Sequence, residues 1–270
     1  MSAPVQSPPT SRLRAEGVTL RYDQRVVSTG LSVDIPSNEF TVIIGPNACG
    51  KSTLLRSLSR LLRPAEGQVT LDGNPLPSFR PKDFARTVGL LPQSSIAPEG
   101  ITVVDLVSRG RFPYQKLVRQ WTDADEQAVR TAMAATNVAE LANREVAELS
   151  GGQRQRVWAA MAIAQQTPIL LLDEPTTFLD LTHQIEMLDL FARLHRAGTT
   201  VVAVLHDLNQ AARYATHLIV MKSGTLIASG PPAEVLTEHL VREVFELNCM
   251  VSEDPASGTP LIIPTDGQWR

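Results

Sequence analysis

Cysteines and long apolar runs are both scarce in this chain. Only two of its 270 residues are cysteine, Cys49 and Cys249, which excludes the disulfide framework of small secreted domains and fits a reducing compartment. The longest apolar runs, such as 169–172 and 201–205, have the length of strands and fall far short of the ~20 residues of a membrane-spanning helix. If the protein serves a membrane, a partner must therefore supply the membrane-embedded part.

An excess of positive charge is also absent. The chain has 25 Lys and Arg against 28 Asp and Glu, for a net charge of −3, so no overall basic field attracts nucleic acid or an anionic membrane. With 43% hydrophobic and 20% charged residues, the composition is that of an ordinary globular protein with a substantial core. Residues 1–12 are rich in Pro and Ser and have no apolar centre, which argues against a signal peptide and predicts a disordered tail at 1–10.

Strand-like and helix-like segments alternate along much of the chain. Apolar patterns predict strands at 13–22, 31–35, 40–44, 68–71, 169–172 and 200–205, and a hairpin of 218–221 with 225–228 around Ser223-Gly224. Helical spacing predicts helices from Lys51 to the leucines before Pro64, within 122–142, from the N-cap Ser150 to 166, at 181–196 and at 232–245. We therefore expect a core at 11–93 and 167–230, a mostly helical insert at about 94–166, and a C-terminal extension at 231–270 that ends in an irregular tail.

The segment GPNACGKST fits the phosphate-binding pattern G-x-x-x-x-G-K-[ST]. Its residues are Gly45, Pro46, Asn47, Ala48, Cys49, Gly50, Lys51, Ser52 and Thr53. Small residues leave backbone N–H groups free to meet a polyphosphate, and the start of the following helix adds N–H groups and a positive dipole end. Lys51 is expected to neutralise the β- and γ-phosphates, Ser52 to bind Mg²⁺, and Thr53 to support the α- and β-phosphates. The alternative is a Gly-rich turn that binds no ligand.

Cys49 lies inside this loop, directly before Gly50. It has no partner cysteine nearby and is expected to serve as a small residue at a tolerant position. A thiol at a helix N-terminus beside Lys51 is expected to have a lowered pKa. This hypothesis predicts that thiol alkylation inhibits ATP hydrolysis and that ATP protects.

Two acids and a histidine follow apolar strands that are expected to end at one edge of the sheet. Ligands bind at the carboxyl ends of parallel strands, so Asp173 is expected to hold Mg²⁺ and Glu174 to act as general base toward the attacking water. His206 follows the strand 201–205 and is expected to contact the γ-phosphate. The alternative is that all three are ordinary polar residues at the exposed ends of core strands.

The segment LSGGQ, residues 149–153, places Ser150, Gly151, Gly152 and Gln153 at the start of a predicted helix. A helix N-terminus of this kind is a second anion site, built without lysine. A single nucleotide cannot easily use both sites of one chain, so the sequence predicts a head-to-tail dimer with ATP between the phosphate loop of one copy and the Ser150 helix of the other. The alternative is a simple capped helix start.

The order of six motifs resembles that of the nucleotide-binding subunits of ATP-binding-cassette (ABC) transporters. The motifs are GPNACGKST, LLPQ, LSGGQ, ILLLDE, TFLD and LHD. The resemblance covers nearly the whole chain after about residue 11. It implies an α/β fold: a P-loop NTPase (RecA-like) core with an N-terminal antiparallel β-subdomain and an inserted α-helical subdomain. It also implies hydrolysis of ATP with Mg²⁺, at the cytoplasmic face of a membrane, by two copies attached to permease subunits.

The resemblance assigns roles to three further residues. Tyr22 matches the aromatic residue that stacks on adenine, although it could equally be a packed strand residue. Gln93 of LLPQ is expected to sense Mg²⁺ and the attacking water and to link the core to the insert. Asp180 of TFLD is expected to contact the phosphate loop of the opposing subunit. Two departures from the family pattern are visible, Ala48 for a common Gly and Thr177-Phe178 for a common Ser-Ala.

Three segments resemble importer ATPases for ferric siderophores, ferric citrate and haem, with cobalamin importers as close cousins. They are RGRFPYQ (109–115), RQW (119–121) and EPTTFLDLTHQIEMLDL (174–190). From its residues alone, RGRFPYQ is an exposed cluster of Arg and aromatic side chains that suits a protein partner. The alternatives are a basic helix end with ordinary aromatic packing and a generic anion patch. The resemblance implies a permease partner and, indirectly, a substrate-binding protein, while the iron complex itself does not touch this chain.

Other classes remain open at this point. Another importer ATPase, for cobalamin or haem, is the main alternative. A soluble cassette acting on DNA or ribosomes is less favoured, because the chain has no long coiled-coil insertion, second cassette or basic stripe. A regulatory module without turnover and an exporter subunit are the remaining alternatives; Glu174 and His206 argue against the first and the insert motif against the second.

Overall fold

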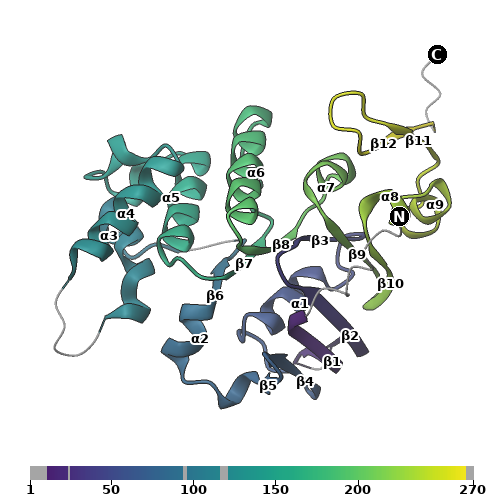
Figure 1. Ribbon diagram of the computed structural model, residues 1–270, viewed down its shortest axis with the longest axis horizontal. Helices are drawn as coiled ribbons and strands as arrows, with labels where there is room; N and C mark the ends of the chain where they lie inside the picture. The colour runs from purple at the N-terminus through teal and green to yellow at the C-terminus, as the bar shows by residue number, and fades with distance from the viewer. Residues whose placement is uncertain (1–10, 24, 94–95, 116–120, 266–270) are drawn as a thin grey trace, which may run out of the picture.

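A six-stranded sheet lies at the centre of the protein (Figure 1), with strand order β10-β9-β3-β8-β7-β6. The computed structural model describes residues 11–265 apart from 24, 94–95 and 116–120, so the tail predicted at 1–10 lies outside the described residues. The strands are β3 (Phe40–Ile44), β6 (Val88–Leu91), β7 (Ile169–Asp173), β8 (Thr200–Val204), β9 (His217–Lys222) and β10 (Thr225–Gly230). All neighbouring pairs are parallel except β9 and β10. Because β3, β7 and β8 are buried along their whole length, they have continuous apolar sequences.

A second sheet is antiparallel and has the strand order β2-β1-β4-β5. Its strands are β1 (Ser11–Tyr22), β2 (Arg25–Pro36), β4 (Glu66–Leu71) and the short β5 (Asn74–Pro75). Helix α1 (Lys51–Leu58) packs between the two sheets, since its Leu54, Leu55 and Leu58 are fully buried in one apolar cluster with strand residues of both. The phosphate loop that precedes α1 is thereby held against both sheets.

Helices cover the opposite face of the central sheet. They are α5 (Gly151–Ala164), α6 (Leu181–Arg196) and α7 (Leu208–Tyr214), followed by α8 (Pro232–Val235) and α9 (Glu238–Phe245). Phe191 of α6 and Phe40 of β3 are the largest fully buried side chains of this cluster. The cluster extends to the C-terminal strands β11 (Cys249–Glu253) and β12 (Pro260–Pro264) through Cys249 and Ile262.

A helical subdomain lies to one side of the core (Figure 1) and has an apolar cluster of its own. It contains α3 (Val103–Ser108), the 3-10 helix η2 (Arg109–Tyr114), α4 (Asp123–Ala135), two further 3-10 turns at Ala139–Leu141 and Val146–Glu148, and α5. Core elements η1 (Leu76–Ser78) and α2 (Pro81–Thr87) lead to β6 beside it. The predicted fold class is confirmed. The structure has a central sheet that is parallel apart from β10, an antiparallel β-subdomain and a helical insertion.

The helix after the phosphate loop ends earlier than its leucine pattern predicts. It stops at Leu58, with Ser59 as the C-cap and Arg60 in the left-handed region at φ 66°. The N–H of Leu61 donates to the carbonyl of Arg56 (2.9 Å), and that of Arg60 donates to Ser57 (3.1 Å). These two bonds form a Schellman motif, which usually has Gly at the left-handed position. With Arg there, the sequence does not signal the end of the helix, and Leu61 is exposed instead of packed.

Two other expectations about secondary structure are wrong, and strand β6 has no counterpart among the expected strands. The four residues of β6 are too few to show a period. The helix expected at 232–245 is two helices, since Thr237 caps a new one and accepts a hydrogen bond from the N–H of Leu240 (3.1 Å). The tail expected to be irregular forms the β11–β12 hairpin, with Val251 opposite Ile262.

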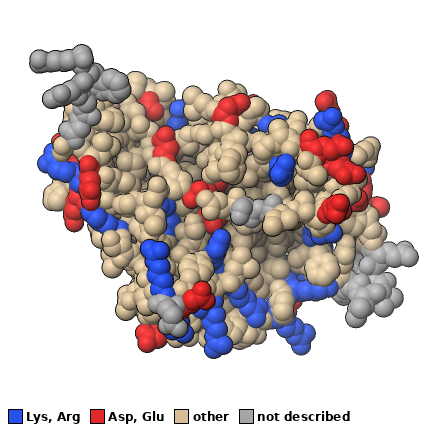
Figure 2. All heavy atoms as spheres, turned by 180° about the vertical axis from the view of Figure 1, so that it is seen from behind, with Lys and Arg blue, Asp and Glu red and all other residues tan. Residues whose placement is uncertain are grey.

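Charged side chains of both signs occur on the face shown in Figure 2, with Lys and Arg gathered toward its lower edge. Among the described residues, no helix combines the length and apolar character needed to cross a bilayer.

Candidate functional site

The phosphate loop joins β3 to α1 through backbone conformations that favour glycine. Gly45 and Gly50 have φ values of 155° and 105°, and a Cβ at Gly45 would collide with the carbonyl oxygen of Met221 in β9. Ala48 also has a positive φ, 59°, which a non-Gly residue adopts only at some cost. The loop therefore passes close to β9 with its backbone N–H groups unobstructed by large side chains.

The ammonium group of Lys51 lies under this loop. Its Nζ donates to the carbonyls of Gly45 (2.8 Å) and Pro46 (2.9 Å), and the residue is 5% exposed. An ammonium group has three N–H donors, so these two bonds fix its position and leave capacity for an anion. The positive charge is thus held where the sequence predicts phosphates.

A cavity of about 410 Å³ opens over the loop. It is lined by Tyr22, Arg25, Val27, the six residues from Asn47 to Ser52, Thr53, Glu174 and His206. Arg25 and Val27 come from the start of β2 and were missed by sequence reasoning, since they belong to no motif. Their only sequence signal was proximity to Tyr22, which pairs with Arg25 across the turn.

Tyr22 stands at the rim of the cavity and is 40% exposed. Its hydroxyl accepts a hydrogen bond from a guanidinium nitrogen of Arg56 in α1 (3.2 Å). The ring is therefore not a packed core residue, and its face is available at the mouth of the cavity. Stacking on adenine stays a prediction that this position supports.

Cys49 corrects one sequence-based expectation. Burial raises the pKa of its thiol, outweighing the opposing influence of Lys51 and of nearby backbone N–H groups. The residue is only 4% exposed and belongs to the apolar cluster around α1. Desolvation of the thiolate is here larger than the influence of the lysine, and the expected low-pKa thiol is therefore wrong.

Ser52 and Asp173 form a pair of oxygen ligands beside the loop. The hydroxyl of Ser52 donates to Oδ1 of Asp173 at 2.7 Å. Burial raises the pKa of the Asp173 carboxyl, and the adjacent Glu174 adds to this, while the Ser52 hydrogen bond opposes it. A hydroxyl and a carboxylate are the hard ligands that Mg²⁺ prefers, with phosphate oxygens and water completing its shell. These residues therefore fit the predicted metal.

Glu174 is the centre of a polar network at the ends of β6, β7 and β8. Its Oε1 lies 2.6 Å from Nε2 of His206, and its Oε2 accepts from Nε2 of Gln93 at 2.6 Å. Oε2 also accepts from the hydroxyl of Thr177 (3.3 Å). Glu174 has a left-handed backbone at φ 53°, a strained conformation that is more frequent at functional sites. The structure thus brings together Gln93 and Glu174, predicted to handle the attacking water, and His206, predicted to contact the γ-phosphate.

The LSGGQ segment lies outside this cavity. Ser150 caps α5: its hydroxyl accepts from the N–H of Gln153 (3.2 Å), and the Gln153 side chain accepts from the N–H of Ser150 (3.1 Å). Gly151 stays exposed, and a Cβ added there would approach only the side chain of Phe178. Within one chain, this helix start and the phosphate loop are therefore two separate sites.

Asp180 is also outside the cavity. It caps α6, where its Oδ1 accepts from the backbone N–H of His183 (2.9 Å). The same Oδ1 lies 2.7 Å from the ring nitrogen Nδ1 of His183. The His183 hydrogen bonds lower the pKa of the Asp180 carboxyl. Nearby, Phe178 is 77% exposed and has a φ of 67°. An exposed aromatic residue with strained backbone adjoins the Ser150 helix start.

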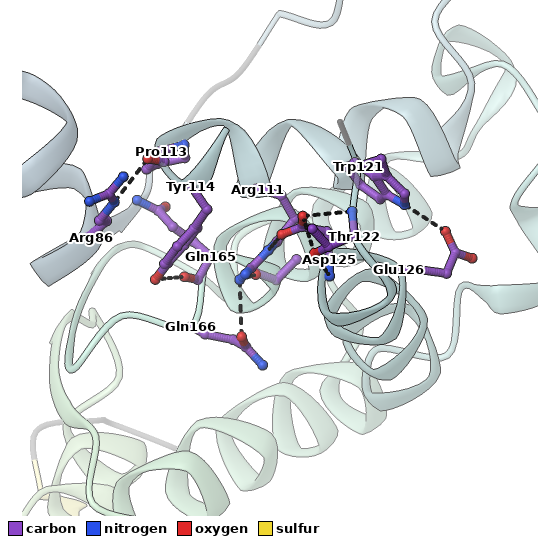
Figure 3. A network of polar contacts seen from close by, with 11 residues as sticks. Arg86, Arg111, Pro113, Tyr114, Trp121, Thr122, Asp125, Glu126, Gln165 and Gln166 are labelled. Atoms are coloured by element: carbon purple, nitrogen blue, oxygen red, sulfur yellow. Dashed lines mark hydrogen bonds and ion pairs between the residues drawn. The ribbon is translucent and has the colours of Figure 1, made fainter. Parts of the chain in front are cut away.

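The RGRFPYQ segment differs from the exposed cluster that its sequence predicts. Arg111 is 5% exposed. Its Nε lies 2.9 Å from Oδ1 of Asp125, and its other donors bond the Ala164 carbonyl and the Gln166 side chain. Figure 3 shows Arg111 between Asp125 and Gln166. Its guanidinium also lies 4.0 Å from the ring centre of Tyr114. Arg111 is therefore a buried structural residue, and within 109–115 the exposed residues are Arg109 and Phe112. The neighbouring Arg119 and Gln120 lie outside the described residues.

Comparison with known proteins agrees with this geometry. The family model described as "ABC transporter" matches residues 28–177, more than half of the chain. The chain belongs to the ABC transporter family. It is an ABC ATPase subunit: it has the nucleotide-binding cassette of these transporters.

The relatives of this ABC ATPase span nearly its full length. It is 52% identical to the ferric enterobactin transport ATP-binding protein FepC of Escherichia coli (strain K12), over 94% of each chain. It is 51% identical to the petrobactin import ATP-binding protein FpuD of Bacillus anthracis, over 93% of each. Among solved structures, the dimeric bacterial cassette MJ0796 matches with a TM-score of 0.73 and 27% identity, covering 81% of this chain and 98% of that one.

Proposed function

We propose that this ABC ATPase powers a membrane importer of ferric siderophores or related iron chelates. Two relatives that share half of its residues over nearly their full length are named for transport of ferric enterobactin and import of petrobactin. The observation that carries the hydrolytic part is the Gln93–Glu174–His206 network beside the Lys51 loop.

We propose that Lys51 and the N–H groups of the loop hold the β- and γ-phosphates of ATP. Ser52, Asp173 and Gln93 are the residues that would hold Mg²⁺, whose chemistry is to neutralise charge on the phosphates. Tyr22 covers the adenine side of the cavity, while Thr53 supports the α- and β-phosphates. Phosphoryl transfer of this kind depends mainly on positioning and on charge stabilisation.

Glu174 acts as the general base that takes a proton from the attacking water. Each of its two carboxylate oxygens accepts a hydrogen bond or ion-pair contact in the network, yet a carboxylate has about four acceptor positions. Gln93 and His206 therefore orient the carboxylate without exhausting it. In this proposal His206 also reaches the γ-phosphate, and Gln93 reports the occupancy of the site to the insert.

A second copy of the chain completes the site. The Ser150–Gln153 helix start and Asp180 are exposed and separate from the cavity, so one chain cannot present them to its own nucleotide. We propose a head-to-tail dimer in which these residues face the loop of the partner, as the dimeric cassette among the similar structures would allow.

The remaining assignments concern the membrane. We propose that the dimer is attached to permease subunits at the cytoplasmic face of the cell membrane. The insert at about 94–166 makes this attachment. A substrate-binding protein delivers the chelate to the permease. The ATP-bound and ATP-free dimers then favour different permease conformations. No nucleic acid takes part in this scheme.

Uptake of radioiron tests the proposal. A strain that lacks the gene should lose uptake of at least one ferric siderophore, and the wild-type gene should restore it while a Lys51→Ala gene should not. Loss of haem or cobalamin uptake with normal ferric siderophore uptake would replace the iron chelate by one of those cargoes. Normal uptake of every compound in the panel would refute the import function.

A further inference from the structure

The C-terminal hairpin is part of the main core. Strands β11 and β12 pair from Cys249–Pro264 to Glu253–Pro260, and their inward-facing Cys249 and Ile262 are 5% and 4% exposed. Both residues belong to the apolar cluster formed by α6, α7 and the central sheet. Figure 1 shows the hairpin beside α7, at the end of the sheet away from the helical subdomain. A shift of this hairpin would therefore disturb the packing of α7.

Side chains occupy both outer edges of the hairpin. On the β11 edge, the N–H of Val251 donates to Oε1 of Glu238 in α9 (3.2 Å). On the β12 edge, the N–H of Ile262 donates to Oδ1 of Asn209 (2.8 Å), and the Ile262 carbonyl accepts from Nδ2 of the same residue (3.2 Å). The Asn209 amide thus pairs with one backbone residue as a neighbouring strand does. Only a side chain with both a donor and an acceptor can make this pair.

Asn209 lies close to the catalytic network along the chain. It is in the first turn of α7, three residues after His206, and the N-cap of this helix is Asp207, whose Oδ1 accepts from the N–H of Gln210 (2.8 Å). His206 in turn lies 2.6 Å from Glu174. The segment that presents His206 is therefore anchored on one side by β8 and on the other by the Asn209–Ile262 pair.

We propose that Asn209 is a positioning residue for ATP hydrolysis, and that the C-terminal hairpin acts through it to hold His206 against Glu174. Loss of the two Asn209 hydrogen bonds frees the first turn of α7 from β12. A misplacement of about 1 Å at a catalytic group can cost as much as 100-fold in rate, and the 2.6 Å contact of His206 leaves little room for such a shift.

The rest of α7 stays attached when these bonds are lost. The side chain of Gln210 donates to Gln184 of α6 (2.9 Å), and the hydroxyl of Tyr214 donates to Asp189 of α6 (2.8 Å). The helix should therefore remain folded while its first turn is less well fixed. ATP affinity should change little, because most of the proposed phosphate contacts come from the loop at 45–53 and His206 contributes one at most. The inference rests on the proposed roles of Glu174 and His206.

Steady-state ATPase kinetics of full-length variants test the proposal. Asn209→Leu keeps the approximate size of the side chain and removes both hydrogen bonds. We expect kcat to fall about three- to tenfold, as for lost contacts that hold a catalytic group, with KM for ATP within twofold of wild type. Tyr214→Phe is the matched control, because it removes one polar bond of the same helix about two turns from His206, and its kcat should stay within twofold.

A double-mutant cycle separates positioning from simple destabilisation. In a His206→Ala background, Asn209→Leu should change kcat by less than twofold, because the residue it positions is gone. Asn209→Asp, which keeps the acceptor but sets a carboxylate against the Ile262 carbonyl, should also lower kcat and serves if the Leu variant does not fold. An unchanged kcat in the folded variants would overturn the proposal. So would a decrease of kcat by the same factor when Asn209→Leu is introduced into wild type and into His206→Ala.

The proposed function fails in a different way. If Lys51→Ala and Glu174→Gln keep full ATPase activity, the assignment of the hydrolytic site is wrong whatever Asn209 does. If those two variants are inactive and Asn209→Leu is normal, only the role of the hairpin is refuted.

Discussion

The buried pair of Arg111 and Asp125 holds the helical subdomain together and permits a quantitative test. The two side chains are 6% and 9% exposed and 2.9 Å apart. Arg111 also donates to the carbonyl of Ala164 at 2.9 Å and to the side chain of Gln166 at 3.0 Å. The pair thus links η2 to α4 and to the end of α5. Replacing Arg111 by Met leaves a buried carboxylate and two acceptors without their donor.

The expected loss is large for a single substitution. Breaking a buried ion pair from one side costs about 3–5 kcal/mol, and for a chain of this size about 1 kcal/mol corresponds to about 2–4 °C in Tm. Arg111→Met should therefore lower Tm by roughly 6–20 °C. The double variant Arg111→Met/Asp125→Leu should recover part of this loss, because it removes the unpaired charge as well.

The effect of pH on stability follows from Asp125. Burial raises the pKa of its carboxyl, but hydrogen bonds from Thr122 and Arg111 outweigh it, so the folded pKa lies below the ordinary value. The ionised Asp125 carboxylate therefore contributes fully to the free energy of unfolding above its unfolded pKa of about 3.9. This contribution is lost as pH falls through the lower pKa of the folded state. Arg111→Met should weaken this acid dependence, while the Thr122 hydrogen bonds to Asp125 remain.

Thermal unfolding followed by circular dichroism gives the measurement. Arg130→Met is the control, since Arg130 pairs with Glu126 of the same helix at 3.4 Å but is 72% exposed, and it should cost about 0.5 kcal/mol or less. If Arg111→Met lowers Tm no more than Arg130→Met does, the buried pair does not hold the subdomain together and this reasoning is refuted.

Three further predictions concern the site. Glu174→Gln should lower kcat by about 100-fold or more, as expected for loss of a general base, and should give an ATP-dependent dimer in analytical ultracentrifugation; a monomer with ATP would contradict the shared site. Lys51→Ala should abolish ATP binding measured by calorimetry, and unchanged affinity would contradict the loop assignment. Iodoacetamide should alkylate Cys49 at pH 7 more slowly than a free thiol, because the side chain is 4% exposed and burial raises its pKa; rapid alkylation of wild type that a Cys49→Ser variant lacks would contradict the buried thiol.

Features governed by local sequence could be predicted closely. The bounds of α6 agree with the expected 181–196, because Asp180 caps its start and its apolar residues have helical spacing. Ser150 and Thr122 both form capping boxes, in which the deciding residue lies three positions away. The proximity of the motif residues in space could also be predicted, because the carboxyl ends of parallel strands meet at one edge of a sheet.

Features decided by distant contacts could not be predicted. Arg111 is buried because Asp125, 14 positions later, and the end of α5 meet it in space, and no local pattern distinguishes it from an exposed arginine. The pKa of the Cys49 thiol depends on packing around α1, which outweighs the nearby lysine. The β11–β12 hairpin is likewise fixed by α7 and α9 through Asn209 and Glu238.

Helices α6 and α7 connect the surface assigned to the second copy with the catalytic network. Gln184, in the first turn of α6, donates to the carbonyl of Leu179 (2.9 Å), the residue before Asp180, and accepts from Gln210 of α7 (2.9 Å). Because α7 begins directly after His206-Asp207, we expect a movement of the Asp180 loop in the proposed dimer to be transmitted to both helices. The coupling energy between Asp180 and His206 measures this connection. His206 already lies 2.6 Å from Glu174 in the single chain, so in the proposed dimer we expect contacts at Asp180 to stabilise this arrangement through α6 and α7.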